Sequence, residues 1–145
     1  MSLANVFNIA GSGMSAQSVR LNTVASNIAN AESVSSSVGE TYRARQPLFA
    51  VAYNQALQGQ GSSNGASAGL GVEVKGIVES QAPLRRQYEP DHPMADAEGF
   101  VFYPNVNVVE EMTNMISASR SFQTNADIMN SAKEMLQRAL TLGQN

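Results

Sequence analysis

The chain has 145 residues, of which 43% are apolar and 14% charged, and it contains no cysteine. A chain of this length and apolar content can bury one core, and without cysteine it has no disulfide, thiolate nucleophile or cysteine-based zinc site. A net charge of −3, with no basic run longer than Arg85-Arg86, argues against nucleic acid and anionic lipid as partners.

Residues 1–31 are predicted to form one long helix. Apolar side chains repeat every seven residues along two lines, which is typical of a helix that packs along one face. One line holds Phe7, Met14, Leu21 and Ile28, and the other holds Ala10, Gln17, Val24 and Ala31. Gly11 and Gly13 each cost about 1 kcal/mol relative to alanine inside a helix. We therefore expect this helix to depend on packing partners.

The same segment lacks the features of a cleaved secretory signal. No basic residue precedes Arg20, and Asn5, Asn8 and Ser12 interrupt the apolar residues. No window of the chain reaches the roughly 18 to 20 consecutive apolar residues that cross a bilayer. We therefore expect no membrane insertion, and any export has to use a route other than a cleaved signal peptide.

Residues 32–106 are predicted to form a middle region with flexible loops. Two stretches, 33–39 and 57–71, are rich in glycine and serine, as linkers and loop tips are. Residues 65–69 match the G-x-S-x-G pattern, in which a turn between a strand and a helix presents a nucleophilic serine. Because neither a strand nor a helix flanks this match, we attribute it to composition and not to catalysis.

Short strands are also predicted in this middle region. The expected strand positions are Val72, Val74, Ile77 and residues 100–103. Gly76 is a candidate bulge, and the segment 87–99 is rich in turn-forming residues. Residues 42–53 fit either a strand or a helix, with Pro47 marking a break, and the sequence leaves this segment undecided.

His92 is the single histidine, and several carboxylates lie near it in the sequence. Their spacing fits neither a zinc site nor an EF-hand. A proline-anchored turn, in which Asp91 and Asp96 bond their own backbone, explains the segment better. We therefore predict no metal site, no cofactor and no catalytic residue.

Residues 107–145 are predicted to form the C-terminal helix, with its last apolar residue at Leu142. One apolar line holds Val108, Met115, Phe122, Met129 and Leu136, and the other holds Met112, Ser119, Ala126, Lys133 and Leu140. Asn107 and Glu110 form a plausible capping pair, and Gly143 suits a left-handed C-cap. The methionines on this helix are best explained as adaptable packing and not as a metal or promiscuous binding surface.

The outer faces of both predicted helices carry few charges. Arg20 is the only charged residue between positions 1 and 31, and Arg120 and Asp127 are the only ones between 113 and 132. Neutral polar faces pack against neighbours without the desolvation cost of buried charges. A monomeric helical hairpin would explain the apolar lines equally well. The scarcity of charge favours a self-assembling protein that is mainly α, with its terminal helices paired as a coiled-coil-like bundle around a small β-containing insertion.

The segment 11–33 resembles the N-terminal signature of the bacterial flagellar rod, hook and hook-associated proteins. The signature has an (A/S)-N-x-A-N core, which is here Ser26-Asn27-Ile28-Ala29-Asn30. Residues 42–49 and 88–136 resemble rod proteins of the flagellar basal body, and the junction PNVNVVEEM before the long helix is especially specific. The turn that often follows the motif in hook-type proteins is replaced here by Glu32-Ser33-Val34-Ser35, so hook contacts do not transfer across 32–41.

This resemblance implies a structural subunit of the proximal rod that polymerises helically into the drive shaft transmitting torque for motility. It also implies export by the flagellar type III apparatus without a cleaved signal, a rod that crosses the periplasm, and copies of itself and other rod proteins as partners. Residues 1–31 and 107–145 would form the axial core. The residues expected at the helix-pairing and assembly interface are Phe7, Met14, Leu21, Val24, Ile28, Met112, Met115, Phe122, Met129, Leu136 and Leu140.

Burial of each such side chain contributes about 1.5 to 3 kcal/mol, against about 1 to 2 kcal/mol for ordering each residue. This near balance gives the hypothesis that the termini are largely disordered in the exported monomer and fold on joining the rod. The alternative function is a cytoplasmic secretion chaperone or regulator that binds one partner through the same helices. An enzyme is the third possibility, and the sequence offers no set of catalytic groups for it.

Overall fold

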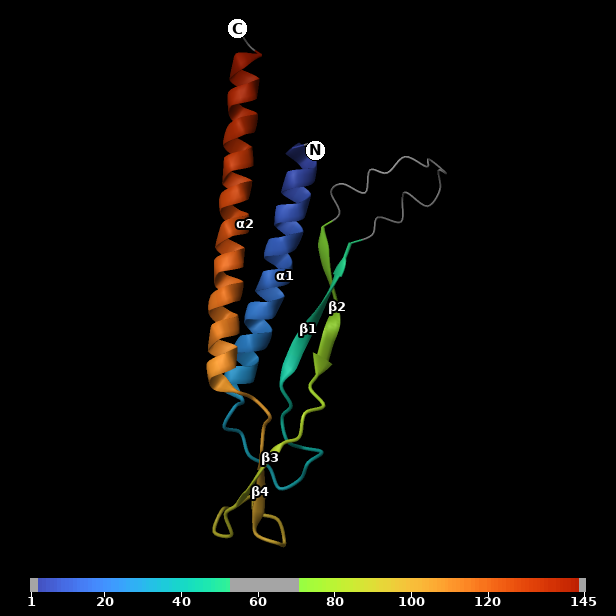
Figure 1. The fold of residues 1–145 in the computed structure, drawn as a ribbon, viewed down its shortest axis with the longest axis vertical. Coiled ribbons are helices and arrows are strands. Elements are labelled where there is room, and N and C mark those ends of the chain that lie inside the picture. The colour runs from blue at the N-terminus through green and yellow to red at the C-terminus, as the bar shows by residue number, and fades with distance from the viewer. Residues whose placement is uncertain (1–2, 53–70, 144–145) are drawn as a thin grey trace, which may run out of the picture.

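The computed structural model describes residues 3–52 and 71–143. Its elements are, in order, α1 (Leu3–Ala29), β1 (Arg45–Val51), β2 (Val72–Glu79), β3 (Arg85–Tyr88), β4 (Phe100–Tyr103) and α2 (Val108–Leu142). The molecule is elongated, with the two helices side by side, β1 and β2 beside α1, and β3 and β4 at the opposite end (Figure 1). This arrangement confirms the expected mainly α fold, in which two long helices flank a small β-containing region.

The helices run antiparallel, and the residues between them are small. The residues of α2 that face α1 recur every seven positions and are Glu111, Ala118, Asn125 and Ala132. All of them except Asn125 are buried. A Cβ at Gly13 of α1 would lie 2.8 Å from Nδ2 of Asn125, so this glycine makes room for the amide. Small side chains allow the two helix backbones to approach closely.

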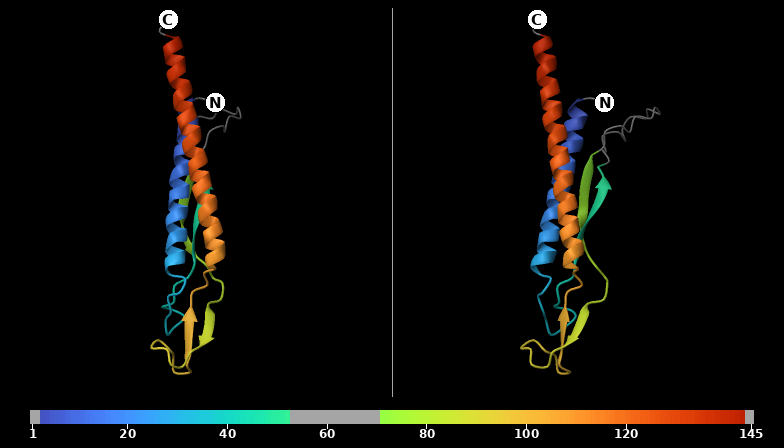
Figure 2. Two further views of the ribbon diagram at one scale, coloured as in Figure 1. Left: turned by 90° about the vertical axis from the view of Figure 1, so that its left-hand side faces the viewer. Right: turned by 60° about the vertical axis from the view of Figure 1, so that its left-hand side comes forward.

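α2 begins and ends close to the predicted positions. Oδ1 of Asn107 accepts from the backbone N–H groups of Val109 and Glu110, which confirms the predicted N-cap. The predicted left-handed C-cap is wrong, because Gly143 has φ −82° and its N–H continues the helical bonding to the Ala139 carbonyl. With 35 residues against 27, α2 extends beyond the N-terminal end of α1 (Figure 2).

β1 and β2 form a two-stranded antiparallel sheet. β1 covers residues 45–51, so this part of the undecided segment 42–53 is a strand. Leu48 pairs with Gly76 and Phe49 pairs with Val74, so Lys75 is the extra residue of a bulge beside the glycine. The bulge predicted at this position is thus confirmed. Since each strand pairs on one side only, Pro47 is accommodated within β1.

β3 and β4 form a second antiparallel pair, of which the apolar pattern predicted only β4. The sequence of β3 is Arg-Arg-Gln-Tyr, all exposed, so it carries no burial signal. The guanidinium of Arg86 lies 3.7 Å from the centroid of the Phe100 ring across the pair. In the turn between the strands, Oδ1 of Asp96 accepts from the N–H groups of Glu98 and Phe100, as predicted for a turn aspartate.

Candidate assembly site

Asn27 of the Ser26–Asn30 motif is fully buried and connects α1 to the strand region and to α2. Its Nδ2 donates to the Arg45 carbonyl at 2.8 Å, and its Oδ1 accepts from the Arg45 N–H at 2.9 Å and from the Tyr42 hydroxyl at 2.8 Å. The Asn27 side chain also lies beside the Glu111 carboxyl of α2 and lowers its pKa. We call Asn27, Tyr42, Arg45 and Glu111 the joint. Because the buried Asn27 side chain of α1 bonds to the strand region and neighbours α2, the joint fixes the helix pair relative to β1.

The other motif residues support the end of α1. The Ser26 hydroxyl lies 3.3 Å from the Tyr42 hydroxyl, and Nδ2 of Asn30 donates to the Ser26 carbonyl at 2.8 Å. Ile28 is half-buried, whereas Ala29 is exposed. Beside the motif, Ala31, Ala44 and Val106 form a small apolar cluster. The motif therefore places a polar, fully bonded centre next to the apolar core.

Glu111 brings a carboxyl group into this buried setting, since the residue is only 6% exposed. Burial raises its pKa above the usual value and nearby Glu110 adds to the rise, while the neighbouring Asn27 amide and the charge of Arg20 oppose it. Oε2 of Glu111 has no hydrogen-bond partner among the described residues. The joint is thus closed except at this one oxygen atom.

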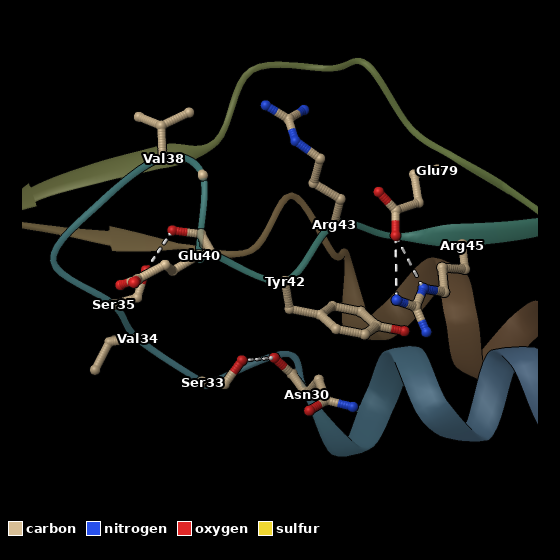
Figure 3. Close-up of a pocket in the computed structure, with 12 residues that line it drawn as sticks. Asn30, Ser33, Val34, Ser35, Val38, Glu40, Tyr42, Arg43, Arg45 and Glu79 are labelled. Atoms are coloured by element: carbon tan, nitrogen blue, oxygen red, sulfur yellow. Dashed lines mark hydrogen bonds and ion pairs between the residues drawn. The ribbon is translucent and has the colours of Figure 1, made fainter.

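An open polar pocket of about 620 Å³ lies beside the joint, between the end of α1 and the loop that follows it. Figure 3 shows Tyr42 reaching from this loop to lie near Arg45, which pairs with Glu79 at 3.1 Å. Nη1 of Arg43 donates to the Ser80 carbonyl at 3.1 Å. The pocket has neither histidine nor cysteine in its lining, and its Arg43, Arg45 and Glu79 side chains bond to the protein itself.

The structure places the predicted interface residues in two environments. Those buried or half-buried in the single chain are Phe7, Met14, Leu21, Val24, Ile28, Met115 and Met129. The terminal methyl of Met129 packs 3.8 Å from the position that a Cβ at Gly11 would occupy. The remaining four, Met112, Phe122, Leu136 and Leu140, are exposed, with Leu140 at 60%.

Besides Met112, large apolar side chains outside the predicted set are also exposed on α2. We call Val109, Met112, Ile116 and Arg120 the outer surface of α2, since their spacing places them on one face of the helix, away from the Glu111–Ala132 line. Val109 is 74% exposed and Ile116 is 55% exposed. Ile128, Met135 and Leu142 are exposed farther along. Contiguous exposed apolar residues of this kind mark a surface that contacts a partner.

The residues singled out for chemistry have local structural roles or lie outside the described ranges. Nδ1 of His92 accepts from the Met94 N–H at 3.0 Å, and no group of three potential metal ligands occurs within residues 3–52 and 71–143. The serine pattern at 65–69 lies outside the described residues. Neither described helix has the length and apolarity needed to cross a membrane.

Sequence reasoning found the motif but not its partners. Tyr42, Arg45 and Glu111 are far from Asn27 in the chain, and nothing in their local pattern marks them as neighbours. The sequence offered one signal, which is the position of Glu111. It lies one helical turn beyond the Asn107 cap and at the seven-residue spacing that also contains Ala118 and Ala132.

Comparison with known proteins gives two family matches and several relatives. Residues 7–34 match the family described as flagella basal body rod protein, and residues 97–142 match the C-terminal family of flagellar basal body rod FlgEFG proteins. Flagellar basal-body rod protein FlgC of Escherichia coli O6:H1 is 50% identical over 144 residues, covering 99% of this chain and 100% of the relative. FlgC of Salmonella typhimurium has the same identity and coverage, and FlgC of Borreliella burgdorferi is 36% identical over 151 residues, with 99% of each chain covered.

Proposed function

Because this chain belongs to the FlgC family of flagellar basal-body rod proteins, and so is a structural subunit of the rod and not an enzyme, we propose that it polymerises helically into the drive shaft. Its neighbours are copies of itself and other components of the proximal rod. The shaft crosses the periplasm and transmits torque for motility. Family membership supports this proposal, and the exposed apolar residues of α2 are the observation that carries it.

Those apolar residues have a clear energetic role in a polymer. A large apolar side chain contributes about 1.5 to 3 kcal/mol when it is fully buried. Val109 and Ile116 gain little of this in the single chain, where they are 74% and 55% exposed. In a polymer each copy would bury them against a neighbour. Several such residues per subunit are enough to offset the entropy that a subunit loses on joining.

We further propose that residues 1–31 and 107–145 form the axial core of the shaft, with α1 and α2 paired as in a coiled coil. The seven-residue spacing of Glu111, Ala118 and Ala132 on the buried face of α2 supports such pairing. Leu136 and Leu140 are exposed and continue the predicted apolar lines toward the C-terminal end of α2, which extends beyond the N-terminal end of α1 (Figure 2). These residues are therefore available to a neighbouring subunit.

The joint supports the transmission of torque. A shaft transmits torque only if the parts of each subunit keep their relative orientation under load. The bonds from Asn27 to Tyr42 and Arg45, and its position beside Glu111, connect α1, the strand region and α2 at one buried point. We propose that the joint prevents the helix pair from bending relative to the strands as the rod turns.

The route to the rod is proposed from the family. Rod subunits have to leave the cytoplasm, and we propose export by the flagellar type III apparatus without a cleaved signal. A chain without cysteine is compatible with the oxidising periplasm.

Deletion of the gene, followed by electron microscopy of the cells, tests the proposal. We expect deleted cells to lack hook and filament, and a plasmid copy to restore both. Basal bodies purified from the restored cells should contain the protein. Intact, rotating flagella on deleted cells would refute a role in the shaft.

A further inference from the structure

A second cavity, of about 410 Å³, lies between α1, α2 and β1 and contains the open end of the joint. It is lined by Arg20 and Val24 of α1, Glu110, Glu111 and Asn114 of α2, and Arg45, Gln46, Pro47 and Phe49 of β1. Its volume accommodates a long side chain entering from outside. Within the described residues, two carboxyl groups of this cavity have no ion pair, and one carboxylate oxygen accepts no hydrogen bond.

Both arginines of the cavity already have other partners. Nη2 of Arg20 donates to Oδ1 of Asn114 at 2.9 Å, and Arg45 pairs with Glu79 at 3.1 Å. Glu110 and Glu111 therefore form no ion pair within residues 3–52 and 71–143. Two adjacent carboxyl groups therefore line the cavity without an ion pair. The positive charge of Arg20, which also lines the cavity, favours the ionised form of Glu111 but forms no salt bridge with it.

Glu111 makes this deficit costly. The residue is 6% exposed, and its Oε2 accepts no hydrogen bond from any described residue. A buried carboxylate oxygen without a donor costs more than an ordinary unmade hydrogen bond, because the charge has lost its water as well. Glu111 lines a cavity that is open to solvent, so a donor entering from outside the chain comes close to its carboxyl group.

We propose that this cavity receives the guanidinium group of Arg120 from a second copy of the chain. The guanidinium presents several N–H donors in a planar fork, which suits simultaneous bonding to the carboxyl groups of Glu110 and Glu111. Phe49, half-exposed at the cavity, offers an aromatic ring for the guanidinium to stack on. The proposal rests on the proposed function, in which copies of this chain adjoin one another.

Arg120 is the donor that the chain itself offers. It is exposed, and the structure shows no ion pair, side-chain hydrogen bond or ring contact for it among the described residues. It cannot serve its own cavity, because nine residues of helix separate it from Glu111, about 13 Å along the axis. Arg120 belongs to the outer surface of α2, so its insertion would also bring Val109 and Ile116 against the neighbouring copy.

This contact joins two different surfaces of the same chain. Such a heterologous contact does not close on itself in a pair, and it repeats as an open helix when the rotation between copies does not close a ring. A rod needs contacts of this kind. The exposed Lys133, which has a point charge and lies far from the outer surface of α2, serves as the matched control.

Cross-linking in purified basal bodies tests the proposal, because the natural chain has no cysteine. Cysteines replace Gln46 at the cavity and Gln123 one turn beyond Arg120, and a short bifunctional thiol reagent is added. The control chain carries Gln46→Cys with Gln137→Cys, one turn beyond Lys133. These three positions are exposed, and their replacement leaves every charge in place. Both chains are checked for incorporation into basal bodies.

We expect cross-linked multimers from the 46/123 chain and few from the 46/137 chain. Adding Arg120→Glu should lower the multimer yield about tenfold, whereas Lys133→Glu should leave it unchanged. Adding Glu110→Arg to Arg120→Glu should recover part of the yield. Equal multimer yields from the two cysteine pairs, or a yield insensitive to Arg120→Glu, would overturn the contact while leaving the rod function intact. Absence of the protein from basal bodies would overturn the proposed function and the contact together.

Discussion

The joint and the outer surface of α2 use the same chain in opposite ways. At the joint, buried polar groups satisfy one another within the subunit except at Oε2 of Glu111, and Asn27 alone bonds both Tyr42 and Arg45. On the outer surface, apolar groups such as Val109 and Ile116 lie exposed in the single chain. Apart from that one oxygen atom, the first region is complete in one subunit, whereas the second is complete only when another subunit covers it.

This difference separates what stabilises the subunit from what assembles the rod. Loss of a bond at the joint should lower the stability of the isolated chain. Loss of an apolar group on the outer surface should leave the isolated chain almost unchanged and prevent assembly. Substitutions in the two regions should therefore have opposite signatures.

Asn27→Ala should cause the largest loss of stability. It leaves the N–H and carbonyl of Arg45 and the Tyr42 hydroxyl without their partner, at about 1 to 3 kcal/mol for each buried group left unsatisfied. We expect the free energy of unfolding to fall by about 3 to 5 kcal/mol, measured by urea denaturation. Asn22→Ala, at an exposed position on the same helix, is the control and should cost well under half as much.

Tyr42→Phe should cost less. The Tyr42 hydroxyl donates to Oδ1 of Asn27 at 2.8 Å, but that oxygen also accepts from the Arg45 N–H, so it keeps one donor in the variant. We expect a loss of about 1 kcal/mol in the unfolding free energy. Tyr88→Phe removes a hydroxyl from an exposed ring and should be neutral. Equal losses in the two variants would show that the Tyr42 hydroxyl contributes nothing to the joint.

Glu111→Gln should change stability in a pH-dependent way. Because burial raises the pKa of Glu111, the folded chain holds its proton at pH values where the unfolded chain has released it. Stability therefore falls as the pH rises from 4.5, the ordinary pKa of a glutamate, through the pKa of Glu111 in the folded chain, and the penalty is fully present above that pKa. The glutamine variant should gain stability over the natural chain at neutral pH, and this gain should shrink on acidification. A gain that stays constant from neutral to acidic pH would contradict the account.

Ile116→Ser should have the smallest effect on the isolated chain. The residue is exposed, so we expect a change within about 0.5 kcal/mol in the unfolding free energy. In cells, the same substitution should reduce incorporation into basal bodies and swimming in soft agar. Gln123→Ser, seven residues farther along α2, is the matched control and should leave both unchanged. Normal motility with Ile116→Ser would show that this part of the outer surface is not an assembly surface.

Local signals made the helices predictable. The apolar repeat and the Asn107 cap place α2 to within one residue of its observed start, and the alternating valines and Gly76 identify β2 and its bulge. These features depend on neighbouring residues in the sequence. β3 escaped prediction because it is held by pairing with β4 and by the stacking of Arg86 on Phe100, not by burial of its own side chains.

The joint was not predictable from pattern for a different reason. Asn27 is recognised through the family motif, but its partners lie at distant positions, and only the fold brings them together. If the residues of α2 that contact α1 are chosen by apolar size, methionines are chosen before Ala118 and Ala132. The two alanines are nevertheless the more buried residues of α2. Where two helices approach closely, the small residues lie inside, so size alone does not identify the contact.

Amide hydrogen exchange, measured on the dilute monomer and on purified basal bodies, tests the contrast between the two regions most directly. We expect residues around the joint, at 23–30 and 108–118, to be protected in both samples. Residues 136–142, where Leu140 and Leu142 are exposed, should exchange rapidly in the monomer and become strongly protected in basal bodies. Equal protection of 136–142 in the two samples, or rapid exchange around the joint in the monomer, would contradict the account.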